Sequence, residues 1–411
     1  MSISKFAKNV ATGYMLIAIL FFGYNMLELP KMLYYAARLL IMAIVAFYAF
    51  NVIIHNVNRS SGIRLFLGYF LYACFTLVFL IGNKYASSLI TEALMSGLFP
   101  MLFFFVGAVD SKEDLFNNKF YKYYFWGCIF MFVCSIYLFV TMPSWYIEWK
   151  RTMVIEEYED NIKIIGSMSG FSGSGYLVGY TALFAFCYLL FKYKGKTAKT
   201  IDYLLMMIVV FCLVFSQARI AIFMAAVILL WYLATSLSLK TFVITIVVTI
   251  PFLIVLNHII SNSEIISGMF EILTEKVEAA SDDKRYETGI ALLSEQTNYL
   301  FGQGYGTGGH KARSLGLIGV TDFEYAKLFY ETGIIGFLYF IIIAFKALSK
   351  KPRFTFEFFI IAFYLLAMLI ANPLTAEATM SPVFWYALGR VICRQSSQRA
   401  VLSSKFKLVS T

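Results

Sequence analysis

Long apolar runs, separated by short polar segments, follow one another along almost the whole chain. A spanning helix needs about 20 apolar residues, and about 12 runs approach or exceed that length. They lie near 10–29, 33–54, 64–83, 87–109, 122–141, 169–191, 201–217, 219–236, 241–261, 325–346, 354–372 and 379–393. The pattern predicts an all-α polytopic integral membrane protein with about 12 transmembrane helices.

The amino-acid composition excludes several other classes of protein. Of the 411 residues, 60% are apolar or aromatic and only 14% are charged, and the mean hydropathy is +0.74. Soluble domains have about 45–50% apolar and about 25% charged residues. These values exclude soluble globular domains, a disordered chain and a disulfide scaffold. The net charge of +10 indicates cations kept on one membrane face rather than a nucleic-acid partner.

The distribution of Lys and Arg predicts the orientation. One set of alternate loops carries 21 of the 34 cations, the opposite set carries 12, and Arg38 falls inside the second predicted span. By the positive-inside rule both termini are cytoplasmic, and the inference is strongest for short loops such as 192–196. No pair of the six cysteines has metal-ligand spacing, so no metal site is predicted.

The predicted spans divide the chain into six parts. These are transmembrane helices 1–5 (1–141), a first large outer segment (142–168), helices 6–9 (169–261), a second large outer segment (262–324), helices 10–12 (325–393) and a basic cytoplasmic tail (394–411). The 262–324 segment, between spans 9 and 10, is large enough for a small helical cap. Its residues 264–280 have amphipathic spacing, and Ser281-Asp282-Asp283 supply N-cap candidates for a second helix near 284–299.

Residues 302–310 read Gly-Gln-Gly-Tyr-Gly-Thr-Gly-Gly-His. A dinucleotide site would need a preceding strand and a soluble cofactor, and this segment is predicted to face outwards. Two interpretations stay open. The stretch is a flexible turn that closes the second outer helix, or it is a backbone that passes close to a ligand around Gly304. His310, at its end, has an imidazole that can titrate near neutrality.

Four arginines are candidate anion ligands or structural charges. Arg219 follows the tight turn Ser216-Gln217-Ala218, where its guanidinium either snorkels to the interface or holds phosphate oxygens. Arg38 must face a polar interior, as a partner of Glu92 or as a substrate contact. Arg285 and Arg313 lie in the large outer segment, where each is individually typical of a solvated surface charge.

Two carboxylates mark the point where the chain re-enters the membrane. Asp322 lies at this boundary, as a helix N-cap or as a shielded carboxylate of raised basicity. Glu331 lies about two and a half turns deeper on the same predicted helix. Gly333 and Gly336 follow it and offer close helix packing.

Three of these stretches together resemble the Wzy-type O-antigen polymerases and the related O-antigen ligases, mainly over 201–346. The first is the short turn that ends in Arg219. The second runs from Arg285 to the glycine-rich Leu300–Thr307 turn. The third is the Glu-x-Gly-Ile-Ile-Gly core that begins at Glu331.

The resemblance implies a metal-independent glycosyltransferase of the bacterial inner membrane that needs no cofactor. Such enzymes transfer a growing glycan from undecaprenyl diphosphate to an incoming lipid-linked repeat unit at the periplasmic face. The implied partners are these lipid-linked donor and acceptor oligosaccharides, membrane lipids, and a chain-length regulator and flippase of the same pathway. The resemblance implies that Arg219 and Arg285 bind the donor diphosphate, and that Asp322 orients or deprotonates the acceptor hydroxyl. Substrate contacts would come from Arg313, His310, Gly304, Glu331 and Arg38.

The sequence departs from the family pattern at two places. The ligases have His nine residues before the Glu of the re-entry helix, where this chain has Asp322, which favours a polymerase over a ligase. An Arg-x10-Gly pattern described for some polymerases is missing, because Ile162 and Gln296 stand where glycine would follow Arg151 and Arg285. A ligase stays as the second enzyme hypothesis. A lipid-oligosaccharide flippase is placed behind both, because the predicted intramembrane charges are few.

Overall fold

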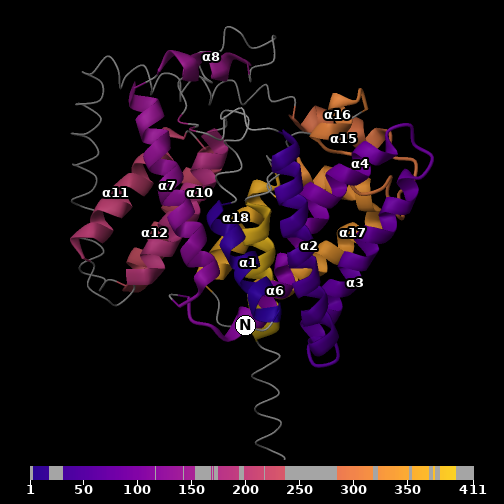
Figure 1. The fold of residues 1–411 in the computed structure, drawn as a ribbon, viewed down its shortest axis with the longest axis horizontal. Coiled ribbons are helices and arrows are strands. Elements are labelled where there is room, and N and C mark those ends of the chain that lie inside the picture. Colours follow the sequence, from indigo (N-terminus) through magenta and orange to yellow (C-terminus); the bar gives the residue numbers. More distant parts are fainter. Residues whose placement is uncertain are drawn as a thin grey trace, which may run out of the picture. The chain divides into compact units, whose positions relative to one another are not determined.

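The structure, a computed structural model, describes most of the chain as helices. The described residues are 3–17, 31–115, 117–141, 143–152, 168, 170, 175–193, 199–216, 218–236, 285–317, 323–350, 354–369, 374 and 380–394. Within these ranges the regular structure is helical and no strand occurs (Figure 1). The prediction of an all-α protein is therefore confirmed for the part of the chain that is described.

Six helices are long and apolar enough to cross a membrane. They are Ala36–Asn56, Ser61–Leu80, Ala86–Lys112, Lys119–Thr141, Gly175–Tyr193 and Glu324–Leu348, and shorter apolar helices span Thr200–Phe215, Arg219–Thr235 and Phe356–Ala367. The predicted ranges other than 241–261, which lies outside the described residues, each coincide with a helix in whole or in part. These helices indicate a multi-pass membrane protein, while the count of about 12 spans and the 262–324 cap stay predictions.

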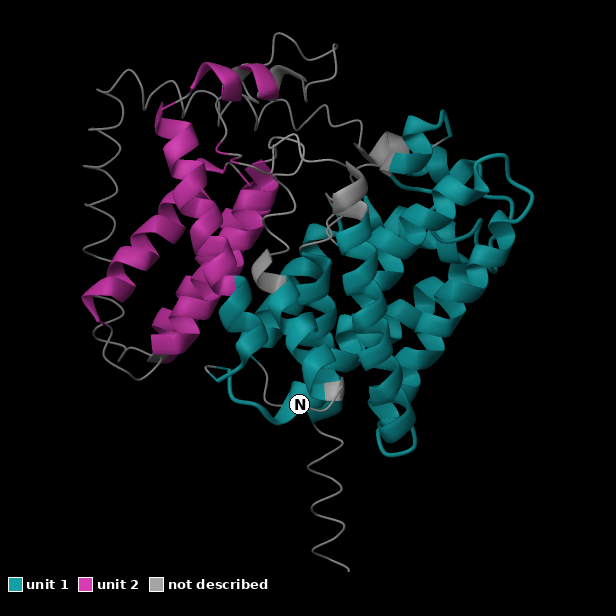
Figure 2. Cartoon of the chain, viewed as in Figure 1, with its two compact units in different colours: residues 1–21, 29–124, 284–411 teal, residues 22–28, 125–283 magenta. Residues whose placement is uncertain are grey.

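The chain forms two compact units (Figure 2). Unit 1 contains residues 1–21, 29–124 and 284–411, and unit 2 contains 22–28 and 125–283. The helices of unit 1 are α1 (Ile3–Ile17), α2 (Lys31–Asn56), α3 (Ser61–Thr76), η2 (Leu77–Leu80), α4 (Ala86–Glu92), η3 (Ala93–Leu98), α5 (Phe99–Met101), α6 (Phe103–Val109), η4 (Asp110–Lys112), the start of α7 (Lys119–Thr141), α15 (Arg285–Ser294), α16 (His310–Ser314), α17 (Glu324–Leu348), α18 (Phe356–Ala367) and a last helix over 381–394.

Unit 2 contains the rest of α7, α8 (Ser144–Thr152), α10 (Gly175–Tyr193), α11 (Thr200–Phe215) and α12 (Arg219–Ser236). The turn between α11 and α12 is as short as the sequence predicts. Its Ser216 hydroxyl accepts a hydrogen bond from the N–H of Ala218 at 3.3 Å. A Cβ added at Gly179 of α10 would come within 2.3 Å of the Ala218 side chain, so only glycine lets α10 approach this turn so closely.

Aromatic rings and glycine contacts build the core of unit 1. The rings of Phe66 on α3 and Phe104 on α6 stack at 3.8 Å. The backbones of α6 and of helix 381–394 touch, because a Cβ at Gly107 would lie 2.1 Å from the carbonyl oxygen of Tyr386. A Cβ at Gly389 would lie equally close to the carbonyl oxygen of Phe104. Small residues at such crossings let membrane helices pack backbone to backbone.

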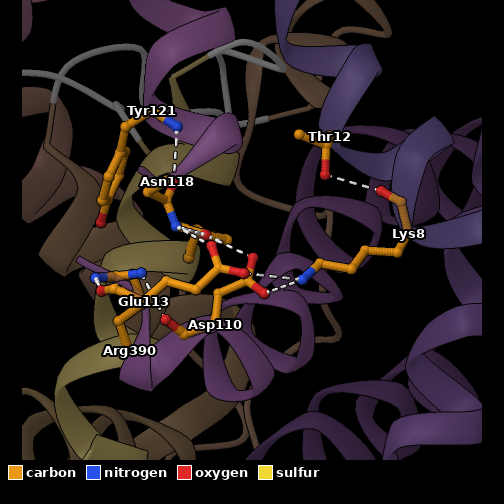
Figure 3. Close-up of polar contacts among 8 residues, drawn as sticks. Lys8, Thr12, Asp110, Glu113, Asn118, Tyr121 and Arg390 are labelled. Atoms are coloured by element: carbon orange, nitrogen blue, oxygen red, sulfur yellow. Dashed lines mark hydrogen bonds and ion pairs between the residues drawn. The ribbon is translucent and has the colours of Figure 1, made fainter. Parts of the chain in front are cut away.

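A polar network ties the ends of several unit 1 helices together at the predicted cytoplasmic side. Buried Arg390 donates from Nε to Glu357 of α18 at 3.0 Å. It also donates to the carbonyl oxygens of Asp110 and Glu113, both at 2.6 Å. Figure 3 shows its guanidinium turned toward this chain segment. One side chain therefore fixes helix 381–394 to α18 and to the turn after α6.

The same network holds the N-terminal helix. The carboxylate of buried Asp110 accepts a hydrogen bond from the hydroxyl of Tyr386 at 2.7 Å. It also pairs with the Lys8 ammonium at 2.5 Å (Figure 3). Lys8 also lies 3.3 Å from a carboxylate oxygen of Glu113. Partial burial lowers the pKa of Lys8, but the hydrogen bond and charge of Asp110 and the charge of Glu113 outweigh it and raise the pKa above its usual value.

The predicted helices of the large outer segment have mixed outcomes. The helix expected near 284–299 begins at Arg285 but ends at Ser294, because residues 295–309 turn back toward the bundle instead of extending the helix. The expected amphipathic helix over 264–280 and the N-cap candidates Ser281–Asp283 lie outside the described residues.

Candidate functional site

The helix α17 is interrupted at Gly333. This residue has φ +63° and ψ −173° inside an otherwise helical segment, a backbone region that is essentially reserved for glycine. The N–H groups after the break donate outside the helix. Ile334 donates to the carbonyl oxygen of Tyr299 at 2.8 Å, and Ile335 donates to that of Leu300 at 3.3 Å. At this interruption α17 is therefore hydrogen-bonded to another chain segment, and we call this backbone contact the joint.

The carbonyl groups before the break also have partners outside the helix. The N–H of Gln303 donates to the carbonyl oxygen of Tyr330 at 2.9 Å, and that of Gly304 donates to Glu331 at 3.1 Å. The hydroxyl of Tyr72, from α3, donates to the Thr332 carbonyl oxygen at 2.7 Å. Irregular backbone in a membrane protein persists where protein buries and satisfies it, and these bonds meet that condition.

The glycine-rich stretch is the segment that completes this joint. Gly302, with φ +83°, lies so close to α17 that a Cβ would come within 2.3 Å of the Glu331 carbonyl oxygen. Gly304 and Gly306 approach the carbonyl oxygens of Thr76 and Leu89 in the same way, at 3.0 and 2.8 Å from a built Cβ. The stretch is a turn, as one interpretation predicted, and all of 302–309 except Gln303 is buried. Its glycines bring the backbone against the protein's own helices, and a ligand contact at Gly304 stays a prediction.

Tyr305 anchors the middle of the stretch. Its N–H donates to the Thr76 hydroxyl at 3.2 Å. Its ring lies over Gly97 in η3, where a Cβ would clash at 2.1 Å. Burial is the main reason that the pKa of Tyr305 lies well above its ordinary value, so the phenol stays protonated. η3 is a single π-helical turn, a local widening that occurs often at functional sites.

Three charged side chains follow one face of α17 beneath the glycine-rich stretch. Glu324, Lys327 and Glu331 are spaced by three and four residues and are 1%, 5% and 1% exposed. Oε1 of Glu331 accepts the N–H of Gly308 at 3.0 Å and lies 4.0 Å from Nζ of Lys327. Oε2 of Glu324 accepts the N–H of Leu374 at 3.2 Å.

The sequence reasoning named Glu331 but missed Glu324 and Lys327. Their spacing with Glu331 on one apolar helix was the available signal. The structure places Glu331 where it holds the glycine-rich stretch, and its contact with a substrate stays a prediction. Asp110, Glu357 and Arg390 are also buried, so the described helices carry more buried charges than Arg38 and Glu92, the two that the sequence reasoning counted.

Arg38 lies in the interior as predicted, 8% exposed on α2. Its Nη2 donates to the carbonyl oxygen of Met95 at 3.0 Å, within the π-helical turn η3. No ion pair joins Arg38 to Glu92, which is half-buried. Arg38 thus satisfies backbone in the widened turn, and the alternative of a substrate contact is untested.

The short helix α16 follows the glycine-rich stretch and carries His310 and Arg313. It docks through Ala312, which is fully buried in a cluster with Leu80 and Leu89. Figure 1 shows α15 and α16 together at the end of unit 1 that also carries α4. Arg313 is exposed, and His310 opens the helix; the side chain of His310 lies outside the described part.

The structure describes the three predicted catalytic residues to different extents. Arg219 is the first residue of α12 in unit 2 and is exposed. Arg285 is the first residue of α15 in unit 1, and its side chain is not among those described. Asp322 lies outside the described residues, directly before Phe323.

Comparisons with models of protein families, with curated proteins and with solved structures give no match for this chain.

Proposed function

We propose that this protein is a polymerase of lipid-linked glycan repeat units, at the periplasmic face of a bacterial inner membrane. The observation that carries the proposal is the joint between the glycine-rich stretch and α17. Two of the three stretches on which the family resemblance rests meet there through backbone hydrogen bonds. The helix that begins at Arg285 belongs to the same assembly, because a Cβ at Gly289 would lie 2.6 Å from the Phe323 ring.

The proposed reaction is a glycosyl transfer between two lipids. The bond between the anomeric carbon of the growing glycan and undecaprenyl diphosphate breaks, and the diphosphate leaves with the electron pair. A hydroxyl of the incoming repeat unit forms the new bond to the anomeric carbon and loses its proton to a base. Arg219 and Arg285 stabilise the charge that develops on the diphosphate, since guanidinium forks pair bidentately with phosphate oxygens. Asp322 is the candidate base or orienting group.

One observation favours a transporter as the alternative. The buried Glu324, Lys327 and Glu331 form the kind of intramembrane charge set that marks ion or substrate pathways. Glu324 and Glu331 accept backbone hydrogen bonds and Lys327 faces Glu331, which fits a supporting role in an enzyme equally well. Purified protein that elongates a lipid-linked repeat without an energy source would exclude transport.

A deletion strain of the source bacterium tests the proposal. Loss of a polymerase leaves a single repeat unit on the lipid core, loss of a ligase removes every attached unit, and an unchanged long-chain ladder on the polysaccharide gel would overturn the enzyme hypothesis. Complementation with R219A should fail at normal protein level. The matched control is R64A, because Arg64 is an equally exposed arginine on α3, and it should restore the ladder.

A further inference from the structure

Two stretches distant in the sequence form one cationic platform in unit 1. Lys311 and Arg313 are exposed on either side of buried Ala312 in α16. Exposed Lys84 precedes Tyr85, which packs on the same cluster as Ala312. The Lys84 ammonium lies 5.4 Å from the centroid of the Tyr85 ring, and this cation–π contact leaves its charge intact. The docking of α16 on α4 therefore gathers three cations.

These cations are not neutralised by the surrounding described chain. The stretches 77–91 and 310–317 contain no Asp or Glu, and Glu92, the last residue of α4, is half-buried. No ion pair joins Lys84, Lys311 or Arg313 to a carboxylate of the described residues. Cations on the predicted outer face also run against the positive-inside bias. Three exposed cations that form no ion pair with a described carboxylate are suited to an anion from outside the protein.

An exposed aromatic strip is formed by the segments that precede Lys84 and α16 in the chain. The rings of Phe75 and Phe79 lie 5.6 Å apart, and the ring of Phe301 lies 6.3 and 6.1 Å from them. They are 49%, 38% and 38% exposed, and Ile81 at the following turn is 75% exposed. Lys84 comes five residues after Phe79 in that turn. Exposed cations that follow an exposed apolar surface in the chain match the two ends of a phosphate-headed lipid.

The backbone that carries the platform is fixed. The glycine-rich stretch before α16 is bonded to α17 at Gln303, Gly304 and Gly308. At the other stretch, the N–H of Asn83 donates to the Leu80 carbonyl oxygen at 3.1 Å. A preorganised set of charges loses less free energy on binding than a mobile one.

We propose that this platform and strip bind the polyprenyl diphosphate of the acceptor lipid. The diphosphate would lie on Lys84, Lys311 and Arg313, and the first isoprenoid units would lie on the aromatic strip. The inference rests on the proposed function, which requires two polyprenyl diphosphates at once and assigns the donor to Arg219 and Arg285. No bond of the acceptor diphosphate breaks in that reaction, so lysines that hold it as point charges are adequate.

The experiment measures equilibrium binding of undecaprenyl diphosphate to the purified protein in phosphatidylcholine nanodiscs, with no turnover. The test variant is K84A/K311A/R313A. Its matched control is R64A/K119A/K122A, which removes the same charges from exposed positions on the predicted cytoplasmic side. We expect the test variant to weaken one of two binding events by about tenfold or more, since one charge-assisted hydrogen bond already corresponds to about that factor. The control should bind as wild type, and K84R/K311R should retain binding.

Two results would overturn the inference. One is unchanged binding in the test variant. The other is displacement of the lipid by phosphatidylglycerol at equal concentration, which would make the platform a site for bulk anionic lipid. The binding experiment measures no catalysis, so its result is separate from that of the deletion strain. An unchanged polysaccharide ladder in the deletion strain would refute the polymerase, whereas lipid binding by the platform is decided by the binding experiment alone. If the polymerase stands, the test variant should raise KM for the acceptor and leave KM for the donor unchanged.

Discussion

The carboxylate of Glu331 accepts the backbone N–H of Gly308 at 3.0 Å, and so joins α17 to a stretch that precedes it in the chain by 23 residues. Both groups are buried, and the ammonium of Lys327 lies 4.0 Å from the same carboxylate oxygen. This contact, with the backbone bonds around Gly333, makes the glycine-rich stretch part of the bundle.

Removing the Glu331 carboxylate should loosen the stretch. In E331A, the Gly308 N–H loses its acceptor and the buried Lys327 ammonium loses the Glu331 carboxylate, so we expect a loss of about 3–5 kcal/mol of unfolding free energy. Thermal unfolding in detergent, followed by the reactivity of the buried Cys393 thiol, measures the change. The double variant K327M/E331Q should recover part of the loss, because Gln keeps an acceptor for Gly308 and the Lys327 ammonium is removed together with the Glu331 carboxylate. Equal loss in both variants would contradict a role for the charge pair.

The break in α17 should depend on glycine at position 333. An alanine there would hold a backbone conformation that costs about 1–3 kcal/mol, and its Cβ would meet the Leu300 carbonyl oxygen at 2.3 Å. We expect G333A to lower the unfolding temperature. Gly13 in α1 is the control, since a Cβ there meets nothing within 4 Å. G13A should stabilise by about 0.5–1 kcal/mol, as alanine does in a helix interior. A neutral G333A would show that the break is dispensable.

The helices were predictable and the joint was not. Apolar runs of spanning length have one favourable structure in a membrane, so the ranges of α2, α3, α7 and α17 follow from the sequence. The conformation of Gly333 depends on Tyr299 and Leu300, about 30 residues earlier, and a single apolar run carries no sign of that pairing. The sequence marked Gly333 and Gly336 as packing glycines. Gly336 does pack against Tyr72, at 2.7 Å from a built Cβ, whereas Gly333 breaks the helix.

The sequence also predicts single charged candidates without showing which residues lie beside them in the fold. The sequence predicts Arg313 as a separate surface charge and does not single out Lys84. The two residues are 229 positions apart in the sequence. Burial of Ala312 against Leu80 and Leu89 brings the two cations to one platform. Such a platform depends on tertiary packing between segments with no local pattern in common, so periodicity within either segment does not reveal it.

The Arg390 network should dominate the stability of the predicted cytoplasmic end of unit 1. R390M leaves Glu357 buried without its partner and removes the donors to Asp110 and Glu113, so we expect a loss of about 3–5 kcal/mol. The control R64M removes an exposed arginine and should change stability by less than about 0.5 kcal/mol. The double variant R390M/E357M should recover part of the loss. Chemical unfolding in detergent measures all three, and similar midpoints for R390M and R64M would contradict the network.

The Lys8 contact predicts how stability responds to alkaline pH. The folded pKa of Lys8 lies above its ordinary value near 10.5, so the ammonium binds its proton more tightly in the folded state. Its stabilisation is therefore fully present below about pH 10 and is lost as the pH rises through the folded pKa. K8M should be less stable than wild type at pH 8, and the difference should shrink as the pH rises above 10.5. Unfolding temperatures of both proteins between pH 7 and 11.5 test this. A constant gap between K8M and wild type across the range would refute the linkage.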